Sequence, residues 1–223
     1  MKIAAFETAT EWCSVALWLD GDVRAVEARA GQRHGELVLP MLESLLAEAR
    51  LASADLDAVA FGAGPGSFTG LRIACGIAQG LAFARNLPAC GVSSLAALAE
   101  EGGAARIVAC LDARMGEVYY SALEKQGARW REVVAAQCVP PAQAPRPPGE
   151  GWTGCGSGFA AHGAALARLG LVAVHAEIHP SAAAVARLAA PRLAAGEGVD
   201  AARIAPVYLR DKVALTTEER RNR

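Results

Sequence analysis

Lysine is scarce in this chain of 223 residues, which contains only Lys2, Lys125 and Lys212. Its formal net charge is −1. Proteins that bind nucleic acid tightly neutralise phosphates with clustered lysine and arginine side chains. The sequence predicts no broad cationic face, so tight binding of nucleic acid by this chain alone is not expected.

Long apolar runs are also missing. The apolar run at residues 1–6 is followed directly by Glu7, so it is too short for a signal peptide. The longest candidate, residues 71–84, is interrupted by Arg72 and Gln79, so no segment is expected to cross a bilayer. Apolar residues still make up 53% of the chain and charged residues 20%, which argues against disorder. We therefore expect a globular, cytoplasmic protein.

Paired cysteine motifs are absent. The six cysteines form no Cys-x-x-Cys pair and have no histidine at zinc-ligand spacing, so buried, reduced thiols are expected. They are Cys13, Cys75, Cys90, Cys110, Cys138 and Cys155. His175 and His179 are four residues apart, but Pro180 follows the second, which disfavours a shared helical face. Surface or capping histidines are the expectation, without a metal site.

What is present begins with a β-meander. Residues 3–28 are typical of three short strands, with turns at residues 8–11 and 20–21. A helical pattern with an apolar face follows over residues 36–50. Pro40 leaves two alternatives for this helix: it begins near Pro40, or it begins earlier and is kinked there.

A glycine-rich loop at residues 62–66 follows a short apolar strand and precedes a long helix. This helix is predicted to begin at Ser67 or Thr69 and to end near Arg85. Loop glycines permit tight turns, and a helix N-terminus attracts anions. No lysine follows the glycines, so the loop is not a P-loop. The pattern favours glycines that serve the turn geometry over an anion site.

Gly102-Gly103 is a plausible boundary between two halves of the chain. After it, an apolar strand at residues 107–111 ends in Asp112, much as the first strand ends in Glu7. This echo predicts a duplicated α/β unit. The predicted domains are residues 1–103 and residues 104–223.

The second half contains five prolines within residues 140–148, which predicts an extended surface connection. Residues 154–158 are glycine-rich and predict a turn that opens a helix over residues 159–169. A strand at residues 171–174 and a helix at residues 181–195 are expected to follow.

Two glycines, Gly76 and Gly80, lie four residues apart within the long helix and share one face. A glycine in a helix interior costs about 1 kcal/mol relative to alanine, so a packing reason is expected. Close approach of another protein's helix and packing against the chain's own sheet are equally good explanations from the sequence.

Three motifs resemble the TsaB (YeaZ) family: GPGSFTGLR at residues 64–72, LDARMGEVY at 111–119 and PVYLR at 206–210. Segments 33–41 and 91–95 match the same pattern, so the resemblance covers nearly the whole chain. It implies an α/β class fold, actin-like or ASKHA (RNase H-like), with two related α/β domains. The family is kin to the catalytic subunit TsaD.

In TsaD, a His-His-Met-Glu-Gly-His stretch follows the corresponding Gly-Val pair, and two of its histidines hold the catalytic metal. Here Ser94 and Leu98 occupy those two positions, and neither can replace imidazole as a metal ligand. Residues 7–10 also replace the Asp-Gly-Thr of active relatives. The resemblance therefore implies no catalytic residue, no metal and no cofactor, and it leaves a weak nucleotide site open.

The resemblance implies a non-catalytic scaffold that dimerises with TsaD and supports threonylcarbamoyl transfer to tRNA adenosine. The resemblance also implies that the small ATPase TsaE completes the complex and that this chain contacts tRNA only through that complex. Without TsaD, the chain is expected to form a homodimer. The expected interface residues are Leu42, Leu45, Leu46, Phe68, Leu71, Arg72, Cys75, Gly76, Gln79 and Gly80. A metal-dependent glycoprotease-like peptidase and a stand-alone ATP-dependent carbamoyltransferase or kinase are the alternatives.

Overall fold

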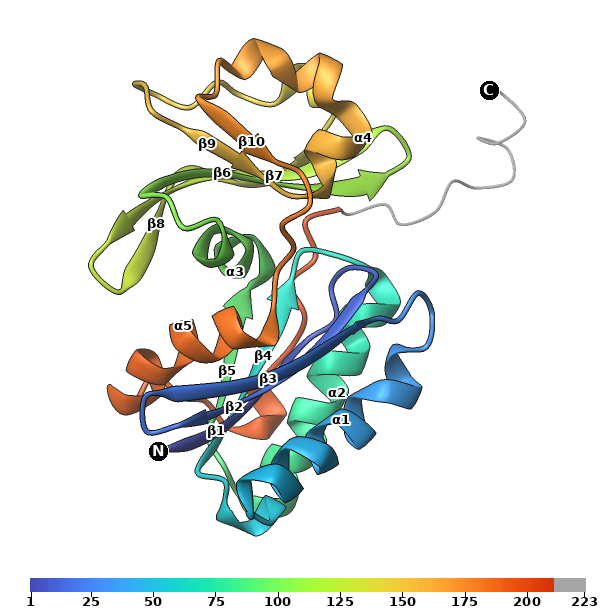
Figure 1. Ribbon diagram of the computed structural model, residues 1–223, viewed down its shortest axis with the longest axis vertical. Coiled ribbons are helices and arrows are strands. Elements are labelled where there is room, and N and C mark those ends of the chain that lie inside the picture. Colours follow the sequence, from blue (N-terminus) through green and yellow to red (C-terminus); the bar gives the residue numbers. More distant parts are fainter. Residues whose placement is uncertain (211–223) are drawn as a thin grey trace.

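The computed structural model describes residues 1–210, which form two five-stranded sheets stacked along the long axis of the molecule (Figure 1). The first sheet has the order β3-β2-β1-β4-β5. Its strands are β1 (Lys2–Glu7), β2 (Trp12–Leu19), β3 (Asp22–Arg29), β4 (Ala58–Gly64) and β5 (Ala89–Ser93). Strands β1 to β3 form the predicted antiparallel meander, while β4 and β5 run parallel to β1.

Both faces of the first sheet are covered by helices. On one face, α1 (His34–Ala49) and α2 (Phe68–Arg85) pack against Ala4 and Phe6 of β1. On the other face, α5 (Ala182–Ala194) packs against neighbouring positions of the same strand. Because successive side chains of a strand point to opposite faces, β1 is apolar throughout.

The helix starts decide the alternatives that the sequence left open. Helix α1 begins at His34 and contains Pro40, so the earlier start is correct. Ser67 caps α2, because its side chain accepts a hydrogen bond from the backbone N–H of Gly70. The helix ends at Arg85, and its C-cap residue Asn86 is left-handed, with a φ of 53°.

The second sheet has the order β10-β9-β6-β7-β8. Its strands are β6 (Arg106–Arg114), β7 (Glu117–Gln126), β8 (Arg129–Val139), β9 (Thr153–Cys155) and β10 (Ala173–His175). Helix α3 (Ser94–Glu101) lies between the two sheets and packs its leucines on β6 (Figure 1). Helix α4 (Ser157–Leu166) lies on the other side of the second sheet.

Short 3-10 turns complete the described chain. They are η1 (Ser53–Asp55), η2 (Pro141–Gln143), η3 (Ala167–Leu169) and η4 (Ala201–Arg203). The proline-rich segment is less exposed than predicted, because Pro141 is buried and Tyr120 donates a hydrogen bond to the carbonyl of Pro145 at 2.7 Å. Pro147 is buried as well, whereas Pro148 is exposed, so the segment is only partly a surface connection.

The predicted boundary at Gly102-Gly103 separates the strands of the two sheets, but it does not separate all helices. Helix α5 and the turn η4 follow the second sheet in sequence and return to the first sheet. The division into residues 1–103 and 104–223 stays a prediction, and residues 211–223 lie outside the described part. Within residues 1–210, no helix is long and apolar enough to span a membrane.

Candidate functional site: the outer face of helix α2 and the cleft between the sheets

Five of the ten expected interface residues lie in the core of this chain. They are Leu42, Leu45 and Leu46 of α1, and Leu71 and Cys75 of α2, with exposed fractions between 1% and 7%. All of them except Leu71, which lines the cleft between the sheets, belong to the apolar core beneath the first sheet, because a helix places residues three and four positions apart on one face. A partner on the surface of the folded chain does not reach them.

The other five lie on the outer face of α2. Phe68, Arg72, Gly76, Gln79 and Gly80 are all exposed. Gln79 also donates a hydrogen bond to the carbonyl of Ala201 at 3.1 Å, which joins α2 to η4. Phe83, which the sequence analysis did not select, continues this face and is 80% exposed.

Gly76 and Gly80 have no packing role within residues 1–210. A Cβ atom built on either glycine meets no atom within 4 Å. Their flank of α2 is therefore open, and packing on the chain's own sheet does not explain them.

Phe68, Arg72 and Tyr208 form a stack at the start of α2. The guanidinium carbon of Arg72 lies 3.5 Å from the centre of the Phe68 ring and 5.8 Å from that of Tyr208. The two rings are 5.6 Å apart. Within residues 1–210, no carboxylate pairs with Arg72. The stack therefore presents a cation held by two aromatic rings, a combination typical of protein interfaces.

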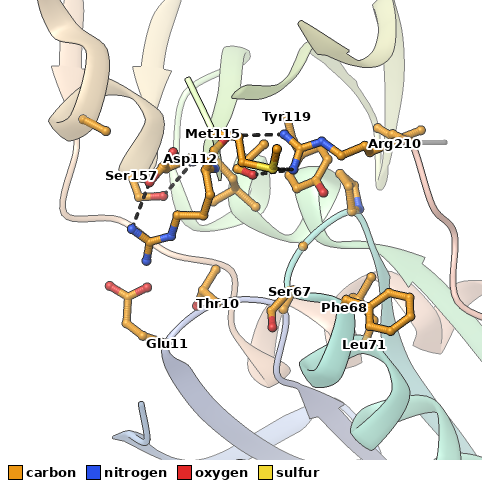
Figure 2. A pocket seen from close by; sticks show the side chains of 18 of the residues that line it. Thr10, Glu11, Ser67, Phe68, Leu71, Asp112, Met115, Tyr119, Ser157 and Arg210 are labelled. Atoms are coloured by element: carbon orange, nitrogen blue, oxygen red, sulfur yellow. Dashed lines mark hydrogen bonds and ion pairs between the residues drawn. The ribbon is translucent and has the colours of Figure 1, made fainter. Parts of the chain in front are cut away.

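A cleft of about 750 Å³ lies next to this stack, between the two sheets. Figure 2 shows Thr10 and Ser67 on its lower side, and Asp112, Ser157 and Arg210 on its upper side. Asp112 pairs with Arg114 at 3.2 Å, and Nε2 of His162 lies 3.5 Å from its carboxylate without forming a hydrogen bond. The cleft thus has charges of both signs beside apolar side chains such as Leu71 and Leu111.

The glycine-rich loop before α2 is packed against the end of β1. A Cβ atom on Gly66 would lie 2.5 Å from Ala9, and one on Gly70 would lie 1.9 Å from the carbonyl oxygen of Thr8. The backbone N–H of Ser67 donates to the carbonyl of Ala9 at 2.7 Å. These contacts support the prediction that the glycines serve the turn geometry.

Glu7 fills the remaining space at the end of β1. It accepts hydrogen bonds from the backbone N–H of Ala9 at 2.7 Å and from the hydroxyl of Ser94 at 2.9 Å. A Cβ atom on Gly62 would overlap its carboxylate. Burial raises the pKa of Glu7 above its ordinary value, although both hydrogen bonds oppose this shift.

The two positions that the family resemblance matches to metal ligands make structural contacts in this chain. Ser94 is fully buried and binds Glu7, and Leu98 is fully buried against β6. Neither side chain offers a ligand that a transition metal prefers. Among residues 1–210, no cluster of three histidine, cysteine or acidic residues could hold a metal ion.

The remaining candidates are structural. His179 stacks on Trp12, with ring centres 4.3 Å apart, and His175 lies on β10, so the two histidines share no helical face. Gly156 and Gly158 lie against Cys110, which leaves no room for a Cβ atom at either position. The second glycine-rich loop is thus a tight turn, as the sequence predicts.

Tyr208 and Arg210 are the functional candidates that sequence reasoning missed. Both belong to the motif at residues 206–210, which carried the family resemblance but suggested no contact. The tyrosine completes the aromatic stack, and the arginine lines the cleft. The motif and α2 are more than a hundred residues apart in the sequence, and only the fold places them side by side.

Comparison with known proteins agrees with this architecture. Residues 26–217 match the family model "TsaD: tRNA N6-adenosine threonylcarbamoyltransferase". The chain is 39% identical over 224 residues to the tRNA threonylcarbamoyladenosine biosynthesis protein TsaB of Escherichia coli (strain K12), with 96% of each chain covered. It is 41% identical over 156 residues to the protein of the same name from Haemophilus influenzae, with 65% of this chain and 66% of the relative covered.

A solved structure described as "YeaZ from Pseudomonas aeruginosa" superimposes with a TM-score of 0.86 at 39% identity, and 93% of this chain and 99% of that chain are covered. Another, described as an uncharacterized protein with similarity to peptidase YEAZ from the same organism, gives 0.87 at 40% identity, covering 94% and 99%. The expected actin-like, ASKHA-type α/β fold is thereby confirmed. The chain belongs to the TsaB (YeaZ) family, within the wider group of TsaD-related proteins.

Proposed function

We propose that this chain is the non-catalytic partner subunit of TsaD, which it supports in forming N6-threonylcarbamoyladenosine in tRNA. Its relatives are named as proteins of that biosynthesis. The observation that carries the proposal is the open flank of α2, where a Cβ atom built on either of two interior glycines meets no atom of residues 1–210 within 4 Å. Small residues on an exposed helix face allow a second helix to approach its backbone closely.

The contact face in this proposal consists of Phe68, Arg72, Gly76, Gly80 and Phe83. Aromatic and arginine side chains at its two ends provide the anchors that dominate interface energies. The glycines between them form the shallow part of the face, into which a partner helix fits. The core leucines of α1 support this face from below and are not part of the contact.

The non-catalytic character of the chain rests on side-chain chemistry. Ser94 and Leu98 stand where TsaD has metal-binding histidines, and the carboxylate of Glu7 fills the space at the end of β1. No observation favours the peptidase or the stand-alone transferase over the partner subunit. In this proposal TsaE joins the complex of the two subunits, and tRNA contacts this chain only within that complex.

The same exposed face accounts for self-association. Phe68 is 38% exposed and Phe83 is 80% exposed, and burying such rings against a second copy removes apolar area from water. A closed dimer with two-fold symmetry uses one patch twice. We propose that the chain forms this homodimer when TsaD is absent, and that both assemblies occur in the cytoplasm.

Substitution of the glycines tests the contact. A Gly76→Arg or Gly80→Arg variant should fold, because a Cβ atom at either position meets no atom of residues 1–210 within 4 Å and the longer side chain can extend outward from the exposed face. We expect either variant to lose co-purification with TsaD, since arginine blocks the approach of a helix.

The matched control is Gly163→Arg. Gly163 is also exposed within a helix, α4, and a Cβ atom there likewise meets nothing within 4 Å. This variant should bind TsaD as the unmodified chain does. A folded Gly76→Arg protein that still co-purifies with TsaD would count against the proposed face.

A further inference from the structure

Residues 206–210, Pro-Val-Tyr-Leu-Arg, cross from the first sheet to the second along one wall of the cleft, and we call this segment the strap. At its first end, the backbone N–H of Val207 donates to the carbonyl of Ala63 on β4 at 2.7 Å. The carbonyl oxygen of Val207 approaches Gly64 so closely that a Cβ atom there would lie only 2.7 Å away. This end is fixed to the backbone of the first sheet.

The other end of the strap is held by Arg210 at the β6–β7 turn of the second sheet. Its guanidinium donates to the carbonyls of Ala113 at 2.9 Å and Arg114 at 3.2 Å, and it pairs with the carboxylate of Glu117. The turn includes Arg114 and Met115 with φ values of 60° and 57°, a conformation that side-chain-bearing residues rarely adopt. One side chain thus stabilises a turn that is costly by itself.

The middle of the strap joins the aromatic stack on α2. Tyr208 lies against Phe68, the first residue of α2, and Arg72 lies over both rings. Tyr208 is 43% exposed and Phe68 is 38% exposed. A protein that covers the start of α2 therefore touches the strap as well.

We propose that the strap couples the partner face on α2 to the far side of the cleft, with Arg210 as its end on the β6–β7 turn. A partner that packs on Phe68 and Tyr208 immobilises the strap, and the three Arg210 contacts carry this restraint to the turn. The two ends are held differently: the first by one backbone hydrogen bond to β4, and the second by the side chain of Arg210, so a substitution of Arg210 releases the second end alone. This inference rests on the proposed function for the identity of the partner, TsaD.

Hydrogen exchange measured by mass spectrometry on the full chain tests the strap alone. The hydrogen bonds from the charged Arg210 side chain restrain local opening of the turn and the strap. Arg210→Ala should therefore raise the rate of amide exchange in residues 113–117 and 207–210 about tenfold. Arg210→Lys keeps a charge for Glu117 but lacks the fork that reaches both carbonyls, so it should show an intermediate increase. Arg203→Ala, which removes an exposed arginine of η4, is the control and should exchange as the unmodified chain does.

The same measurement with saturating TsaD tests the coupling. In the unmodified chain, TsaD should slow exchange in residues 113–117, whereas in Arg210→Ala it should bind and leave these residues unprotected. Equal protection of the turn in both proteins, or none in the unmodified chain while TsaD is bound, overturns the coupling. Failure of TsaD to bind the unmodified chain overturns the proposed function instead, and unchanged exchange in isolated Arg210→Ala overturns the strap.

Discussion

The space between the end of β1 and the glycine-rich loop is occupied by the chain's own residues Glu7, Thr8 and Ala9. The carboxylate of Glu7 lies against Gly62, and Thr8 donates from its hydroxyl to the carbonyl of Gly70 at 2.7 Å. The family resemblance implied that residues 7–10 replace the Asp-Gly-Thr of active relatives. It did not show that the loop glycines make room for the turn after β1, since that contact joins segments about sixty residues apart.

Replacing Glu7 by glutamine tests the electrostatic state of this residue. A carboxyl whose pKa is raised by folding binds protons more tightly in the native state, so the free energy of unfolding falls as pH rises from the ordinary pKa of about 4.3 toward the native one. Glutamine keeps the shape and does not ionise. Relative to the unmodified chain, Glu7→Gln should therefore gain stability between pH 4.5 and pH 7.5 in urea denaturation. A stability difference that stays constant or shrinks over this range contradicts the assignment.

At the scale of elements, the sequence predicted the meander, both long helices and the apolar stripe of α1. It did not show which elements cover these stripes, because periodicity identifies an apolar face but not its neighbour. The leucines of α1 cover this chain's own sheet, and the outward face of α2 is made of glycine, arginine and two phenylalanines. β8 went unpredicted because this edge strand is mostly half-exposed, without clear alternation.

Two substitutions separate the core side of these helices from the outer side. Leu45→Ala should lower the free energy of unfolding by about 2–5 kcal/mol, because Leu45 is 4% exposed and the change leaves a cavity. Phe83→Ser should change it by less than about 0.5 kcal/mol, because the ring is 80% exposed, yet it should weaken TsaD binding. Equal destabilisation by the two changes, measured by chemical denaturation, would show that the two sides are wrongly assigned.

Across the whole molecule, α3 is the structural link between the sheets on the side away from the strap. Glu100 accepts hydrogen bonds from Trp130 of β8 at 2.8 Å and from Lys125 of β7 at 3.0 Å. Glu101 pairs with Arg187 of α5 at 2.6 Å. The return of α5 to the first sheet was not foreseeable from local patterns, because an Ala-rich helix fits either sheet equally well.

The Glu100 contacts predict an acid-sensitive part of the stability. Burial alone raises the pKa of Glu100, but hydrogen bonds from Trp130 and Lys125 outweigh it and hold the pKa below its ordinary value. Such a group stabilises the fold above an unfolded pKa of about 4.3 and loses this contribution as pH falls through the native value. Glu100→Gln should lower the free energy of unfolding by about 1 kcal/mol at pH 7 and by less at pH 3.5. A larger loss in acid than at neutral pH would refute this interpretation.

Reconstitution of the modification tests the central claim most directly. This chain would be mixed with TsaD, TsaE, the adenylate-forming enzyme and unmodified tRNA, with one component omitted at a time, and threonylcarbamoyladenosine in the tRNA would be quantified. The account predicts product only when this chain and TsaD are both present, none when TsaD is omitted, and none when Gly76→Arg replaces the unmodified chain. Product formed by this chain without TsaD would contradict the account.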